Sequence, residues 1–349
     1  MTRIIGLALL GLLALDATAA QTINVADREI NLLGFGDINY IEDEDDPGGF
    51  AQGQFVALLS ASLADRFNLF SEISATARDN EYDVEVERLF VRWEYSDVFK
   101  VSAGRFHTPL GYWNTAYHHG TWLHTSVKRP DVIKFGSRVI PIHFVGLMAE
   151  GSVPIADWSF KYHAGVGNGR YENIARAGDA GDINSDRAWL ITASGRSFNL
   201  PVKFGASIYG DRVSANFLTE DVDEIIVSAY FVWDGDRIEA IAEYHHLDHE
   251  LESGPGDDTS SGYYAQVGYR LPIQTPLTPY ARIEKVDIGN EDPLLDGLGL
   301  DYDATVLGVR YDVAPTVALK GEYRREEFDN NGKQDNNFQI QLSFVVGAR

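Results

Sequence analysis

Apolar and polar residues alternate along most of this chain with a period of two residues. The pattern is clearest at residues 88–95, where the apolar positions are Leu89, Val91, Trp93 and Tyr95. The positions between them are Arg88, Phe90, Arg92 and Glu94. Because neighbouring side chains of a strand point to opposite faces, this segment predicts a strand with one apolar and one charged face. A tight turn at Ser96 and Asp97 and a further alternating run make it half of an antiparallel hairpin.

Segments with this alternation recur over the whole chain and are bounded by turn-forming residues. There are 16 of them, at residues 29–40, 52–63, 67–78, 84–96, 98–106, 142–153, 157–166, 186–197, 201–212, 223–233, 236–247, 261–271, 277–287, 303–313, 316–327 and 337–347. An even number of strands of roughly ten residues is typical of a transmembrane β-barrel. In such a barrel the apolar face meets lipid and the polar face lines the lumen, whereas in a soluble protein the apolar face would cover a core.

The connections between these segments alternate in length. Every second one is short: 64–66, 96–97, 154–156, 198–200, 234–235, 272–276 and 314–315. Most of the others are longer and rich in Asp, Glu, Gly and Asn, as at 42–49, 167–185, 248–260 and 287–301. Short turns at one rim and long loops at the other are the construction of outer-membrane barrels, and a β-sandwich has no reason to maintain it. We therefore predict an all-β fold, a transmembrane antiparallel barrel of about 16 strands.

Aromatic residues gather near the short turns, where they predict an interfacial girdle. They are Trp93, Tyr95, Phe99, Trp158, Phe160, Tyr230, Trp233 and Tyr311. The last predicted strand also alternates, with Phe338, Ile340, Leu342, Phe344 and Val346 on its lipid-facing side. The chain then ends with Gly347, Ala348 and Arg349 and lacks the terminal aromatic residue usual in such barrels.

The first 20 residues have the three parts of a secretory signal peptide: Arg3, an apolar run at 4–15, and small residues at 17–20. We expect cleavage there, export, and a barrel domain at 21–349 in the bacterial outer membrane. No later apolar run approaches the ~20 residues of a membrane-spanning helix. The chain has no cysteine, so it has no disulfide framework and no thiol metal site.

The formal net charge of −23 argues against a nucleic-acid partner. Most of the acids fall in the predicted long loops, at residues 42–46, 220–224, 248–258 and 291–303. Carboxylates there would bind divalent cations that bridge lipopolysaccharide phosphates. The alternative is that they simply solvate the loops. The expected partners are outer-membrane lipid, lipopolysaccharide and small solutes.

The longest connection, at residues 107–140, differs in charge from the rest of the chain. It has Lys128, Arg129, Lys134 and Arg138 against a single Asp131, which gives a formal charge of +3. It also contains four histidines, His107, His118, His119 and His124, and it begins two residues after Arg105, which we add to the candidate constriction. Folded into a barrel, such a loop would focus a positive field on the pore and favour anions. The alternative is that its charges pair with acidic wall residues and hold the loop in place.

Two motifs resemble the phosphate-selective porin O and P family of bacterial outer membranes. Residues 104–111, GRFHTPLG, resemble that family's strand-end motif, and residues 305–315, TVLGVRYDVAP, resemble its penultimate hairpin. The resemblance implies a 16-stranded channel, usually trimeric, whose long third loop folds into the lumen as a constriction.

Extrapolating the alternation of each strand gives a mixed lumen wall. Its predicted cations are Arg88, Arg92, Lys100, Lys161, Lys203, Arg282, Arg310, Lys320 and Arg324. Its predicted anions are Glu72, Glu94, Glu239, Glu243, Glu284 and Glu322. The selective family members have a dense ladder of Arg and Lys, but these cations are scattered. The pattern thus predicts weak anion preference without phosphate specificity.

These observations predict a porin for passive diffusion, with no catalysis and no cofactor. The adjacent pairs His118–His119 and His245–His246 point to opposite faces of a strand and cannot readily chelate one metal. No Gly-x-Ser-x-Gly elbow occurs. Two alternatives are a loop-plugged adhesin and, ranked lower, an outer-membrane lipid hydrolase, for which His143 and His163 have no evident serine partner.

Overall fold

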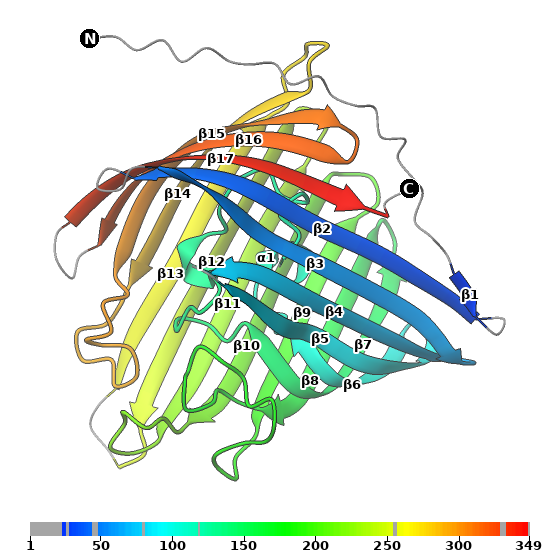
Figure 1. Cartoon of the computed structure of the whole chain (residues 1–349). Helices are drawn as coiled ribbons and strands as arrows, with labels where there is room; N and C mark the ends of the chain where they lie inside the picture. Colours follow the sequence, from blue (N-terminus) through cyan, green and yellow to red (C-terminus); the bar gives the residue numbers. More distant parts are fainter. Residues whose placement is uncertain are drawn as a thin grey trace.

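The protein forms one closed antiparallel barrel. The computed structural model describes residues 23–25, 28–43, 48–78, 81–117, 119–253, 257–328 and 333–347. From β2 to β17 each strand pairs antiparallel with the next, and β17 pairs with β2 to close the sheet (Figure 1). The predicted barrel of 16 strands is confirmed. The predicted signal peptide, His118, Ala348 and Arg349 lie outside the described residues.

The strands match the predicted segments closely. They are β2 (Arg28–Asp43), β3 (Gly49–Ala64), β4 (Phe67–Arg78), β5 (Glu81–Ser96), β6 (Phe99–His107), β7 (His143–Ile155), β8 (Trp158–Asn168), β9 (Ala188–Ser197), β10 (Val202–Val213), β11 (Val222–Asp234), β12 (Ile238–Leu251), β13 (Asp257–Tyr269), β14 (Leu277–Asp287), β15 (Tyr302–Ala314), β16 (Val317–Phe328) and β17 (Lys333–Val346). A short strand that the sequence did not predict, β1 (Ile23–Val25), pairs with the start of β2.

One predicted long loop is shorter in the structure. β12 and β13 continue well into residues 248–260, and Glu250 lies opposite Asp257. Leu247 and His249 are fully buried on the inner side of β12. The inner side chains therefore stabilise the end of this strand, although the acids around them suggested a loop.

The outer face of the barrel is apolar and the inner face is mostly polar. Leu89, Val91, Trp93 and Tyr95 point outward and are 36–60% exposed. On β17, Gln339, Gln341 and Ser343 are buried inside, whereas Ile340 and Leu342 are exposed outside. One predicted girdle residue is corrected: Tyr230 faces inward and contacts Tyr112, with ring centroids 5.5 Å apart. Among the described residues, no helix is long and apolar enough to cross a membrane.

A β-bulge in β5 places two consecutive charged residues near the lumen. Glu72 pairs with Arg88 and Ile73 with Val86, so Glu87 is the extra residue of the bulge. Glu87 is buried, and its carboxylate receives the Ser74 hydroxyl at 2.5 Å. On the other neighbouring strand, β6, the residue that faces Phe90 must be a glycine: Gly104 has φ +141°, and a Cβ would lie 2.1 Å from the Leu89 carbonyl oxygen.

The connection between β6 and β7, residues 108–142, folds into the barrel, as predicted, and is called the inner loop below. It contains two short helices that the sequence did not predict, α1 (Trp113–Ala116) and the 3₁₀ turn η1 (Asp131–Ile133). Figure 1 shows α1 within the curve of the sheet. Trp113, Ile133 and Ile140 of the inner loop are fully buried in the hydrophobic core.

Candidate functional site: the lumen and its inner loop

The inner loop is attached to one side of the barrel, strands β12–β16, which we call the loop-bearing wall. Its first anchor is Glu243 on β12. The carboxylate of Glu243 accepts the backbone N–H groups of Tyr112 (2.9 Å) and Trp113 (2.7 Å) and the Tyr264 hydroxyl. These amides begin α1 and have no partner within the helix, so the anion satisfies them. Glu243 thereby fixes the start of the inner loop.

Two further glutamates hold backbone amides in the middle of the inner loop. Glu322 accepts the N–H of Val127 at 2.9 Å, and Glu284 accepts the N–H of Asp131 at 2.6 Å. Arg324 lies between them and donates to both carboxylates at 3.1 Å. The glutamates therefore bind the loop on one side and a buried guanidinium on the other.

Cations of the same wall hold the loop carbonyls. Arg310 donates to the carbonyl oxygens of Trp122 (2.7 Å) and His124 (3.0 Å). Lys320 donates to the carbonyl oxygens of Thr121 and Ser126, the latter at 3.0 Å. Arg282 donates to the carbonyl oxygen of Lys128 at 3.0 Å. The irregular backbone thus receives from side chains the hydrogen bonds that a helix or strand would provide.

This arrangement corrects the predicted pore wall. Arg282, Lys320 and Arg324 point into the barrel as predicted, but each is only 1% exposed. The inner loop binds Arg282 and Lys320, and strand residues surround Arg324. Arg310 is also engaged with the loop and pairs with Asp312 at 2.8 Å. Arg324 acts through the two glutamates that bind loop amides, the other three cations hold the loop directly, and none of the four lines the cavities described below.

The end of the inner loop is held by a residue that the sequence did not single out. Arg170, in the connection after β8, is fully buried and donates to the carbonyl oxygens of Arg138 (2.6 Å) and Val139 (2.8 Å). Its charge is balanced by Glu224 at 2.8 Å. Glu224 also contacts His249, which lies 2.8 Å from Asp292 in the loop after β14. Arg170 looked like an ordinary loop arginine, and only the fold reveals its partners.

Several charged residues of the inner loop are bound to other side chains of the same loop. Lys134 pairs with Asp131 at 2.9 Å. The Arg129 guanidinium lies 3.9 Å from the centroid of the Phe135 ring, and burial lowers the pKa of Arg129 to about 9. Lys128 and Arg138 remain exposed. The predicted basic cluster therefore presents two exposed cations.

His124 contributes no charge at neutral pH. It is buried against Trp113, with ring centroids 4.8 Å apart. Burial, reinforced by the charges of Lys320 and Arg282, holds the pKa of His124 well below its usual value. The imidazole is thus a neutral packing element of the inner loop.

The opposite side of the barrel, strands β3–β8, carries cavities and is called the open wall. On the long-loop side of the inner loop, a cavity of about 760 Å³ is lined by side chains that include Arg105, His119, Phe135, Arg138 and His143. Towards the short turns, cavities of about 280 Å³ and 170 Å³ share Phe90 and Arg92. Space within the barrel thus lies on both sides of the inner loop along this wall.

A buried cluster of histidines and glutamates lies between these cavities. Glu87 contacts the Nε2 atoms of His119 (2.8 Å) and His143 (2.9 Å). His107 lies 3.4 Å from Glu72, which also binds Arg88 at 2.5 Å. His119 belongs to the inner loop and the other residues to β4–β7, so this cluster joins the free edge of the loop to the open wall. No group of three or more His, Asp or Glu in the described part of the chain has metal-binding geometry.

Charges of both signs border the three cavities, in nearly equal numbers. The seven cations are Arg78, Arg88, Arg92, Arg105, Arg138, Lys161 and Arg176. The six anions are Asp37, Asp83, Glu85, Glu87, Glu94 and Glu150. Many are paired, as in Arg92–Glu150 at 3.1 Å and Arg176–Glu85 at 2.7 Å. Lys100 is partly exposed and lies 3.9 Å from Glu94. The cavities therefore carry a small positive excess in a chain of net charge −23.

Comparison with solved structures assigns the architecture. The chain is similar to the anion-selective porin from Comamonas acidovorans, with a TM-score of 0.63 and 11% identity over 91% of this chain and 100% of that chain. It is also similar to the outer-membrane channel DcaP of Acinetobacter baumannii, with a TM-score of 0.62 and 14% identity over 94% of this chain and 100% of that chain. The similarity to OmpT of Vibrio cholerae has a TM-score of 0.57 and 14% identity over 93% of this chain and 100% of that chain. The chain has the fold of outer-membrane porins.

No protein-family model and no curated protein sequence matches the chain. The resemblance to phosphate-selective porins O and P is therefore not confirmed beyond the shared porin fold. Within the described residues, the lumen also lacks the dense ladder of accessible Arg and Lys expected of that family, because Arg282, Lys320 and Arg324 are buried.

Proposed function

We propose that the protein is a porin of the bacterial outer membrane through which small hydrophilic solutes diffuse passively. The observation that supports this most directly is the one-sided attachment of the inner loop. The loop covers most of the loop-bearing wall, where a cavity of about 170 Å³ remains beside Glu239 and Arg270. More space, with cavities of about 760, 280 and 170 Å³, lies along the open wall. An apolar outer face and a polar inner face suit a barrel with lipid outside and water inside.

The solute path follows the open wall, and its narrowest part is the cluster of His107, His119, Glu72 and Glu87. The inner loop acts as the constriction by placing His119 against the wall. Arg105 borders this path: its Nε donates to the Glu87 carbonyl oxygen at 3.2 Å, and its guanidinium pairs with Asp179. Solute size is thus limited by how firmly the loop edge is held.

The selectivity is weakly anionic. Seven cations and six anions line the cavities, and Glu72 at the narrowest part brings the anions to seven. Arg138 and Lys161 are exposed, whereas all seven anions are partly or fully buried, so low-dielectric walls would focus mainly the field of the cations on the path. Arg138 is the main contribution of the inner loop to this field because it is exposed and borders the largest cavity.

The proposed assembly is a homotrimer embedded in outer-membrane lipid and lipopolysaccharide. We propose that the chain is exported with a signal peptide that is cleaved after residue 20. One solved structure with this fold is described as a trimer form of Vibrio cholerae OmpT. Chemical cross-linking in mild detergent would give a three-subunit band, and a single-subunit band alone would contradict the trimer. Amino-terminal sequencing of the mature protein checks the cleavage position.

Planar-bilayer recording of the purified, refolded protein tests the function. The expected result is a stable conductance in potassium chloride and a reversal potential, in a salt gradient, that shows a modest excess of chloride permeability. Liposome swelling with small sugars serves as an independent measurement. A folded barrel without conductance or swelling would contradict the porin and favour an adhesin, whereas strong cation selectivity would contradict only the anion preference.

A further inference from the structure

Three phenyl rings form a row across the open wall, from Phe70 near a short turn to Phe106 at the start of the inner loop. They belong to neighbouring strands: Phe70 on β4, Phe90 on β5 and Phe106 on β6. The Phe70 and Phe90 rings are stacked, with centroids 5.3 Å apart and planes at 11°, and the Phe90 and Phe106 centroids are 4.9 Å apart. The alternation of each strand directs these rings inward, where a water-filled lumen calls for polar groups.

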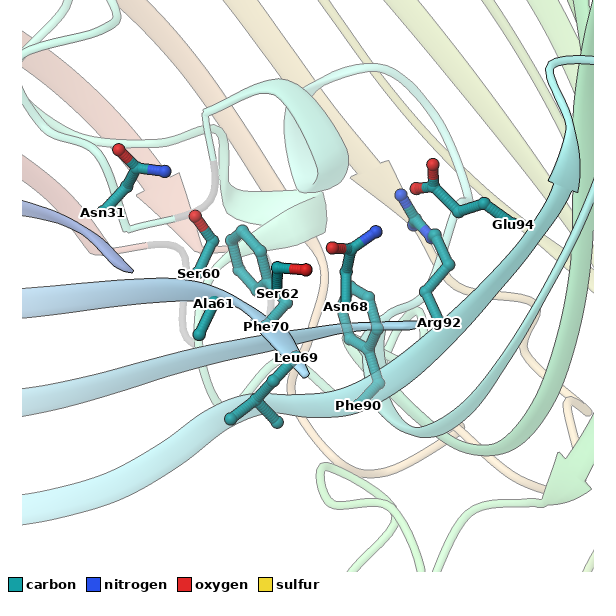
Figure 2. Close-up of a pocket in the computed structure, with 10 residues that line it drawn as sticks. All are labelled: Asn31, Ser60, Ala61, Ser62, Asn68, Leu69, Phe70, Phe90, Arg92 and Glu94. Atoms are coloured by element: carbon teal, nitrogen blue, oxygen red, sulfur yellow. The ribbon is translucent and has the colours of Figure 1, made fainter. Parts of the chain in front are cut away.

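The two ends of this row border different cavities. Phe70 lines the cavity of about 280 Å³, Phe106 lines that of about 170 Å³, and Phe90 lines both. In Figure 2, Phe70 extends to one side of its strand while Leu69 extends to the other. Phe70 is partly exposed, whereas Phe90 and Phe106 are buried. The row therefore offers an apolar surface at one end and along the edges of its rings.

Guanidinium groups lie against the same rings. The Arg88 guanidinium is 4.4 Å from the centroid of Phe70, and that of Arg92 is 5.2 Å from the centroid of Phe90. Arg92 borders both cavities, donates to Glu150 and Ser102, and keeps part of its surface accessible. Lys161 borders the smaller cavity. A ligand that meets these rings thus also meets cations.

We infer that this part of the open wall binds carboxylates that carry an aromatic ring. The ring of the ligand would extend the stack at Phe70, and its carboxylate would replace part of the contact between Arg92 and Glu150. This inference rests on the proposed function and adds a substrate class to it. Neutral sugars also stack on aromatic rings and would bind Asn31, Ser60 and Asn68 nearby, but they would gain nothing from the arginines.

Inhibition of single-channel chloride current tests the inference. Sodium benzoate and sodium acetate are titrated separately on one side of the bilayer at constant ionic strength, with glucose as a neutral solute. Benzoate is expected to inhibit at a concentration roughly two- to tenfold lower than acetate, which is the size of one aromatic contact. Inhibition by benzoate equal to that by acetate, or stronger inhibition by glucose, would overturn the inference.

Two variants separate the ring from the charge. Phe70→Leu should bring the benzoate-to-acetate ratio close to one, while Arg92→Gln should weaken inhibition by both anions. Phe231→Leu is the matched control, because Phe231 is exposed on the outer face of β11, and it should retain the ratio of the unmodified protein. An unchanged ratio in a folded Phe70→Leu variant would overturn the assignment of the ring.

The result also distinguishes this inference from the proposed function. A protein that conducts chloride but treats benzoate and acetate alike remains a porin without an aryl-carboxylate site. A folded barrel with no chloride current contradicts the proposed function and this inference with it.

Discussion

The loop-bearing wall and the open wall share one pattern of residues but have different surroundings. Both alternate apolar and charged residues, and both direct arginines and glutamates into the barrel. On the loop-bearing wall, Glu243, Glu322 and Lys320 are buried and bound to the backbone of the inner loop. On the open wall, Arg92 and Glu94 border cavities. The same strand pattern therefore produces an anchoring surface in one place and a solute path in the other.

The difference follows from the needs of an irregular backbone in a confined space. Buried amides and carbonyls require partners, and hydrogen bonds to charged groups contribute roughly 1.5–3 kcal/mol each. Once the inner loop lies on a wall, that wall's charges are neutralised by the loop and no longer act on solutes. Counting lumen-facing charges from the sequence thus overestimates the charge available to a solute.

Releasing the inner loop should have the largest effect. In Glu243→Ala with Glu322→Ala, several loop amides and Arg324 lose their buried partners. Loss of one partner of a buried pair costs roughly 3–5 kcal/mol. The loop should detach, with a clearly larger single-channel conductance and faster cleavage of the loop by proteases. Glu250→Ala, at an exposed position of β12 away from the loop contacts and the cavities, is the control and should change neither. An unchanged conductance in the folded double variant would show that the loop does not narrow the path.

Removing exposed cations of the solute path should have a moderate effect. Arg92→Gln with Arg138→Gln takes two positive charges from the cavities. Because partly exposed charges interact with roughly 1 kcal/mol or less, the chloride-to-potassium permeability ratio should fall about twofold. Reversal potentials in a potassium chloride gradient measure this ratio. A ratio equal to that of the unmodified protein would assign both arginines to structure alone.

Acidification should weaken the attachment of the inner loop through His124. Its pKa is depressed in the folded protein, so below pH 6.5 the released loop binds a proton that the attached loop does not. Stability is therefore lost as the pH falls below 6.5, by up to about 1.4 kcal/mol per pH unit. Proteolysis of the loop at pH 7 and pH 5 should show this dependence, and His124→Gln should reduce it. His246→Gln, on the outer face, should retain it; equal pH dependence in His124→Gln would contradict the assignment.

Neutralising the pair within the inner loop should have the smallest effect. Asp131→Asn with Lys134→Gln removes two opposite charges that already compensate each other at 2.9 Å. The permeability ratio should stay within measurement error of the unmodified protein. A clear loss of anion preference would mean that Lys134 acts on the solute path despite its partner.

The sequence predicted the barrel well because strand alternation and turn length are local properties. The predicted segment 277–287 coincides with β14, and the inward-facing residues of β16 and β17 were assigned correctly. The contacts of the inner loop were not predictable. They depend on which wall the loop lies against, and Arg282 and Arg92 have the same local pattern with opposite outcomes. The extra residue at Glu87 was equally hidden, since a bulge is a property of two paired strands.

The attachment of the inner loop also implies an order of folding. Lys320 holds the carbonyl oxygen of Thr121 across 199 positions of the sequence, and Glu322 holds the amide of Val127 across 195. Contacts so distant along the chain form late because a large closure entropy must be overcome first. Lys320 and Glu322 lie on β16, and its hairpin partner β17 closes the barrel on β2. The channel can therefore be narrowed only once the carboxyl-terminal hairpin that completes the barrel has been added.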